Sequence, residues 1–87
     1  MASNDFGEFI RMRRAVLRLG LRRFAEKAGL DAGNASRLER GRVAPPESPE
    51  LLNRIASALE LRQGSSEYQQ LIDLAWSYWT SEKTLAH

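Results

Sequence analysis

Residues 25–41, AEKAGLDAGNASRLERG, are helix-forming residues on both sides of a turn at Gly29. Glycine adopts a positive φ at little cost, so Gly29 is expected to end the first helix. Asp31 is a good N-cap for a second helix of about nine residues, which Gly41 would end as its C′ residue. The segment therefore predicts two short helices joined by a tight turn.

The helix before this segment is expected from about Asp5 to Leu19, because apolar residues recur there at spacings of three and four. Ser3 or Asn4 is its expected N-cap. The side chains expected on its inward face are those of Phe6, Phe9, Ile10, Val16 and Leu17.

Two more helices are expected after the segment. The loop that leads to them contains two adjacent prolines, which exclude helix. Ser48 is expected to cap a fourth helix, with Pro49 at its first position. The residues SEYQ, starting at Ser66, form a capping-box pattern and predict a fifth helix over about residues 66–80.

The whole chain is thus expected to be an all-α protein, a compact domain of five helices over residues 1–80 with a frayed tail at 81–87. It has no cysteine, which excludes disulfides and thiolate metal sites. The N-terminal residues MASNDFGEF lack the basic start and apolar stretch of a signal peptide, and no apolar run reaches membrane-spanning length. We therefore expect a cytoplasmic protein.

Positive charge is concentrated in the first half of the chain. Residues 1–43 hold ten Lys and Arg against five Asp and Glu, whereas residues 44–87 hold three against six. Eleven of the 13 basic residues are arginine, whose planar guanidinium suits phosphate and guanine. This distribution suggests a polyanionic partner, although arginines on an ordinary solvated surface would give the same composition.

A helix, a glycine turn and a second short helix form the arrangement that places one helix across a DNA backbone and the next in the major groove. Ala25 is small enough to let the two helices cross closely, and Leu30 and Leu38 supply the buried side of the second helix. The outward residues of the second helix would be Ala32, Gly33, Asn34, Ser36, Arg37 and Arg40. Small outward side chains allow a helix to sit deep in a groove.

These motifs resemble the phage-repressor-like, Cro-like (XRE-type) helix-turn-helix family over roughly residues 6–61. The matching residues are Phe6-Gly7, Ile10 and Arg14, then Phe24-Ala25 and Gly29, and finally Leu38-Glu39-Arg40-Gly41. The resemblance implies a lambda-repressor-like DNA-binding fold and a double-stranded DNA partner.

The resemblance also implies roles for individual residues. Arg14 and Glu39 would form a partly buried ion pair that fixes the second helix of the motif, the recognition helix. The residues that would read bases are Ala32, Gly33, Asn34 and Arg37, with Arg37 the candidate for guanine and Asn34 for adenine or a phosphate. The residues that would bind phosphates are Arg22, Ser36, Arg40 and Arg42.

Several positions leave alternatives open or depart from the family pattern. Arg22 could instead pair with Glu26 one helical turn later. Arg13 stands where leucine is common, so its stem could cover the core while its charge reaches water. Gly33 weakens the recognition helix by about 1 kcal/mol relative to alanine.

Nothing in the sequence indicates an enzyme, a metal site or a cofactor. His87, at the end of the chain, is the only histidine, and the carboxylates lie at ordinary spacings for a helix surface. We therefore expect no catalytic residues, no metal and no cofactor.

The C-terminal helix has more large apolar side chains than one buried face requires. This surplus favours a homodimer, with Leu71, Ala75, Trp76 and Trp79 as interface residues. Plain packing against the core is the alternative. We expect a transcriptional regulator, a dimeric repressor that reads a short palindromic operator. The alternative is an antitoxin or adaptor that binds a toxin or another protein, with or without operator binding.

Overall fold

The computed structural model describes the backbone of residues 4–85 and the side chains of residues 4–80. Ser3, one of the two candidate caps, and His87 lie outside the described residues. The elements in the described part are five helices, α1 (Asp5–Leu17), α2 (Leu21–Ala28), α3 (Ala32–Glu39), α4 (Pro49–Ala58) and α5 (Ser66–Leu85). The predicted all-α class is therefore confirmed. None of these helices is long and apolar enough to cross a membrane.

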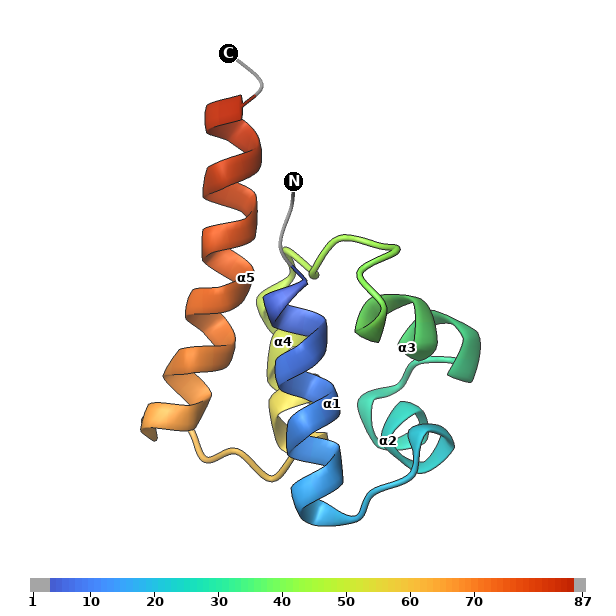
Figure 1. Cartoon of the computed structure of the whole chain (residues 1–87). Helices are drawn as coiled ribbons and strands as arrows, with labels where there is room; N and C mark the ends of the chain where they lie inside the picture. Colours follow the sequence, from blue (N-terminus) through green and yellow to red (C-terminus); the bar gives the residue numbers. More distant parts are fainter. Residues whose placement is uncertain (1–3, 86–87) are drawn as a thin grey trace.

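Helices α1 and α4 lie in the middle of the molecule, with α2 and α3 on one side and α5 on the other (Figure 1). The largest fully buried side chains are those of Ile10 in α1, Phe24 in α2, Ile55 in α4, Leu59 at the end of α4 and Leu71 in α5. Leu38 of α3 joins the same core. A single apolar core thus holds α3 against the rest of the fold, and burial of each large side chain contributes about 1.5–3 kcal/mol.

Helix α1 ends earlier than the sequence predicts, at Leu17 rather than Leu19, because Arg18 adopts a left-handed conformation (φ 53°). The prediction that Val16 faces inward is wrong, since its side chain is 72% exposed. Six residues along a helix correspond to a rotation of roughly 240°, so Val16 cannot share the face of buried Ile10. Asn4 does precede α1, but its side chain makes no capping hydrogen bond.

The caps of the later helices follow local chemistry. Ser48 accepts a hydrogen bond from the Leu51 N–H, and Pro49 is the first residue of α4, as predicted. The cap of α5 is Ser65 rather than Ser66, because the Ser65 Oγ accepts the Tyr68 N–H at 3.1 Å. The shift of one residue leaves the predicted start of this helix correct.

The helical backbone of α5 continues to Leu85, past its predicted end at about residue 80 and into the predicted tail at 81–87. At 1.5 Å per residue, this 20-residue helix is about 30 Å long. Figure 1 shows that its C-terminal end extends beyond the other four helices. Among the described side chains of α5, the buried ones are Leu71 and Ala75, in the first half of the helix.

Candidate nucleic-acid interface

The turn between α2 and α3 is closed by backbone hydrogen bonds and one side chain. Gly29 has a φ of 72°, and the next N–H, that of Leu30, donates to the Ala25 carbonyl at 2.8 Å. Asp31 then caps α3, because its Oδ1 accepts the Asn34 N–H at 2.7 Å. Both predicted ends of this turn are confirmed, and hydrogen bonds fix the short connection between the two helices.

Small side chains allow α2 and α3 to cross closely. Ala25 on α2 and Ala35 on α3 are both buried, and Leu38 completes the apolar side of α3. Leu30, expected to be buried, is only partly covered. Because these residues occupy one side of α3, its other side is turned away from the core.

The outward side of α3 brings together most of the residues expected to contact DNA. Those that are exposed are Gly33, Asn34, Arg37 and Arg40, whereas Ala32 and Ser36 are partly covered. This side carries two arginines and no acidic side chain after the cap residue Asp31. Its shape and charge suit the major groove of DNA, which admits one α-helix.

Side chains on this surface are linked in a chain of hydrogen bonds. The Asn34 Nδ2 donates to Asp31 Oδ2 at 2.9 Å, and the Asn34 Oδ1 accepts from Arg37 Nη2 at 2.5 Å. The guanidinium of Arg37 lies over Gly33, where a Cβ would be 3.5 Å from Arg37 Nη1. A Cβ at this position would make only an ordinary contact with the guanidinium, so the placement of Arg37 does not require glycine there.

The ion pair implied by the family resemblance is present. Arg14 Nε donates to Glu39 Oε2 at 2.5 Å, and Arg14 Nη2 donates to Glu39 Oε1 at 2.8 Å. The hydrogen bond to Glu39 raises the pKa of the Arg14 guanidinium above its ordinary value. Arg14 Nη1 also donates to the Leu19 carbonyl, so one guanidinium joins the end of α3 to the segment after α1.

A second contact between α1 and α3 was not predicted from the sequence. Asn4 Nδ2 donates to the Glu39 carbonyl at 2.9 Å, and a Cβ on Gly7 would lie only 2.5 Å from that same oxygen. The backbones of α1 and α3 therefore lie so close together here that a side chain on Gly7 would not fit between them. The signal in the sequence was Gly7 itself, a glycine inside a helix, which marks a close backbone approach.

The arginines expected to bind phosphates lie at both ends of the motif. Arg22, in the first turn of α2, is exposed, and the partner of the Glu26 carboxylate is Arg23, at 3.3 Å, rather than Arg22. Arg40 and Arg42 are exposed at the end of α3. Phosphate-binding groups on both sides of a recognition helix would match the two backbones that border a groove.

Arg13 makes a hydrogen bond that was not predicted from the sequence. Its Nε donates to the Leu59 carbonyl at 3.1 Å, at the C-terminal end of α4. A cation at this position satisfies a carbonyl that has no partner within the helix. Arg13 therefore joins α1 to α4.

The prediction of a dimer interface on α5 needs correction at two of its four residues. Leu71 and Ala75 are 0% and 3% exposed within one chain, so their side chains belong to the core. Trp76, by contrast, is 73% exposed. Trp79 is partly covered, and its Nε1–H donates to the Pro45 carbonyl at 2.9 Å.

Comparison with protein families agrees with this geometry. Residues 5–65, which include all of α1 to α4, match a family model described as a helix-turn-helix domain. Neither the curated proteins nor the solved structures compared with the chain gave a match. Since the family match covers well over half of the chain, the protein belongs to the helix-turn-helix domain family, as its sequence motifs predicted.

Proposed function

We propose that the protein is a sequence-specific DNA-binding transcriptional regulator that uses α3 as its recognition helix. The observation that carries this proposal is the ordered Asn34–Arg37 pair on the exposed side of α3. The opposite side of the same helix is fixed to α1 through Arg14 and Glu39. A rigidly held helix with oriented polar groups is what reading of base edges requires.

The charge distribution supports the same proposal. The first half of the chain, which contains the motif, has twice as many basic as acidic residues. Arg22 lies in the first turn of α2, and Arg42 lies beyond the end of α3. In the proposed complex these two arginines hold phosphates while Arg37 reaches a guanine in the major groove.

The proposed regulator is a homodimer that represses transcription from a palindromic operator. A two-fold dimer presents two recognition helices, which must be about 34–36 Å apart to enter successive major grooves on one side of the DNA. Trp76 is the proposed anchor, because it is 73% exposed in the single chain and tryptophan is enriched among the residues that contribute most to interface binding energy.

Selection of bound sites from random duplex DNA tests the proposal. Purified protein should enrich one motif made of two inverted half-sites, with centres separated by about 10 base pairs. Enrichment of a single half-site would support sequence reading and contradict the dimer. If folded protein enriches no sequence at all, the proposal is wrong, and a role in binding another protein becomes the better explanation.

A further inference from the structure

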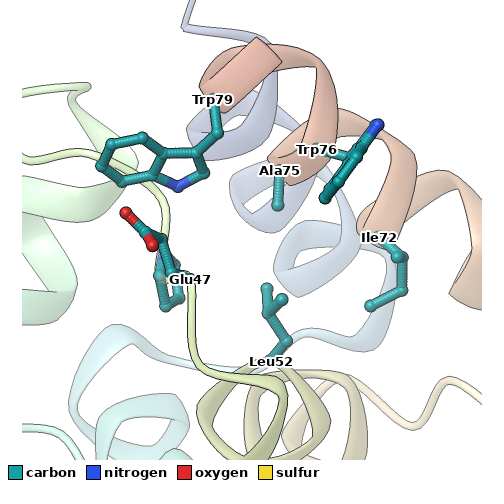
Figure 2. A pocket seen from close by; sticks show the side chains of 7 residues that line it. Glu47, Leu52, Ile72, Ala75, Trp76 and Trp79 are labelled. Atoms are coloured by element: carbon teal, nitrogen blue, oxygen red, sulfur yellow. The ribbon is translucent and has the colours of Figure 1, made fainter. Parts of the chain in front are cut away.

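A cavity of about 160 Å³ lies between α5 and the chain that leads into α4, away from the recognition helix. Its lining consists of Pro46, Glu47, Leu52, Ile72, Ala75, Trp76 and Trp79. Figure 2 shows Glu47 and Trp79 on one side of this cavity and Trp76 with Ile72 on the other, with Leu52 and Ala75 between them. Pockets for drug-sized ligands measure about 300–1,000 Å³, so this one suits a small molecule or a single head group.

Much of the wall of this cavity is fixed by packing. Leu52 and Ala75 are buried core residues and form the inner surface. The indole of Trp79 is held by its hydrogen bond to the Pro45 carbonyl, which precedes Pro46 and Glu47 in the wall. The inner wall and Trp79 are therefore in place before a ligand binds, whereas Glu47 and Trp76 are exposed at the rim.

The polar character of the cavity comes from one carboxylate. Glu47 is the only charged residue in the lining, and it forms no ion pair or hydrogen bond with any other residue that the structure describes. In Figure 2 its carboxylate lies beside the indole of Trp79, on the side of the cavity away from Trp76. The lining contains no cation that could neutralise it.

From this arrangement we infer that the cavity binds a small organic cation of the alkylammonium class, held between the indole rings of Trp76 and Trp79 with its charge toward Glu47. Tryptophan is the best partner for a cation placed over an aromatic ring, and a nearby carboxylate adds direct attraction. The methyl groups of the ligand would contact the apolar inner surface formed by Leu52 and Ala75. An anion would be repelled by Glu47, and a neutral apolar molecule would gain no attraction from this carboxylate, which is exposed to water.

This inference does not depend on DNA binding. None of the lining residues belongs to α2 or α3, so the cation site and the proposed DNA surface can be tested separately. The dimer proposal uses Trp76 as well, but an aromatic ring has two faces. One face of Trp76 borders the cavity in Figure 2, and the other remains for a partner chain.

Titration of the full chain with tetramethylammonium chloride tests the inference. The protein has two tryptophans, so its ¹H–¹⁵N spectrum contains two indole signals, which a Trp76→Leu variant assigns. Both signals should shift along a saturable curve in the wild type. The neutral compound neopentyl alcohol should bind at least about fivefold more weakly, and an equal concentration of sodium chloride should shift neither signal.

Two variants and a control identify the groups responsible. Glu47→Gln and Trp76→Leu should each weaken binding by about threefold, because they remove the carboxylate and one ring. Glu50→Gln serves as the control, since Glu50 is an exposed glutamate at the start of α4 that does not line the cavity. Equal binding of the cation and the neutral compound, absence of shifts, or equal effects of Glu47→Gln and Glu50→Gln would each overturn the inference.

Discussion

Arg14 of α1 and Glu39 at the end of α3 form a two-bonded ion pair across 25 residues of sequence. Their side chains are only 16% and 7% exposed, so water screens the pair weakly. The pair joins the recognition helix directly to the first helix. Substitution of either residue should therefore lower the stability of the fold and, as a consequence, weaken DNA binding.

Loss of either partner should destabilise the fold, because it leaves the other charge partly buried and unpaired. We expect Arg14→Ala and Glu39→Ala each to lower the free energy of unfolding by about 3 kcal/mol. Urea melts of both single variants and the double variant measure the coupling between the residues, which should be about 1–3 kcal/mol. A coupling near zero would contradict the contact.

The close approach of α1 to the end of α3 predicts a second effect on stability. A Cβ at Gly7 would lie 2.5–2.6 Å from the carbonyl oxygens of Glu39 and Leu38. Gly7→Ala should therefore destabilise the protein by about 1–3 kcal/mol through overpacking. Gly20→Ala is the matched control, since a Cβ at Gly20 meets nothing within 4 Å and should change the thermal melt little.

Arg37 and Arg42 should differ in their effects on DNA binding. Arg37→Ala should weaken binding to the selected site by about 1–3 kcal/mol and relax one base position. Arg42→Ala should weaken binding to all sequences alike and reduce the salt slope by about one. Affinities for the selected site and random DNA at several salt concentrations provide the measurement. Equal effects of both variants on both DNAs would rule out these roles.

The hydrogen bond between Asn34 and Arg37 predicts that these two residues read one base position together. If Asn34 orients the guanidinium, Asn34→Ala should relax the same position of the selected site as Arg37→Ala. The double variant should then lose less specificity than the two single losses would give when added. Relaxation of a different position by Asn34→Ala would show that Asn34 reads its own base.

The exposed indole of Trp76 provides a test of the dimer. Wild-type protein should sediment as a dimer at micromolar concentration, and Trp76→Ala should shift it toward monomer without changing the helical signal, because Trp76 lies outside the core. Ser77→Ala, at an exposed neighbouring position, is the control and should remain dimeric. A wild-type monomer, or a dimeric Trp76→Ala variant, would place the contact elsewhere or exclude it.

The amino-acid sequence alone determined the features that depend on neighbours within about four residues. The turn at Gly29, the Asp31 cap and the Ser48–Pro49 start of α4 all follow from local backbone chemistry, and each was predicted at the right residue. The Arg14–Glu39 pair was also predicted, although from family resemblance rather than from spacing.

Only the tertiary structure decided which residues far apart in the sequence contact one another. The hydrogen bonds of Asn4 to the Glu39 carbonyl and of Trp79 to the Pro45 carbonyl join residues 35 and 34 positions apart, and no local pattern specifies such partners. The local pattern also did not specify which side of α5 is buried, because apolar residues occur all around this helix. Packing against α1 and α4 turned Leu71 and Ala75 inward and left Trp76 in solvent, because a core of this size can cover only one side of the helix.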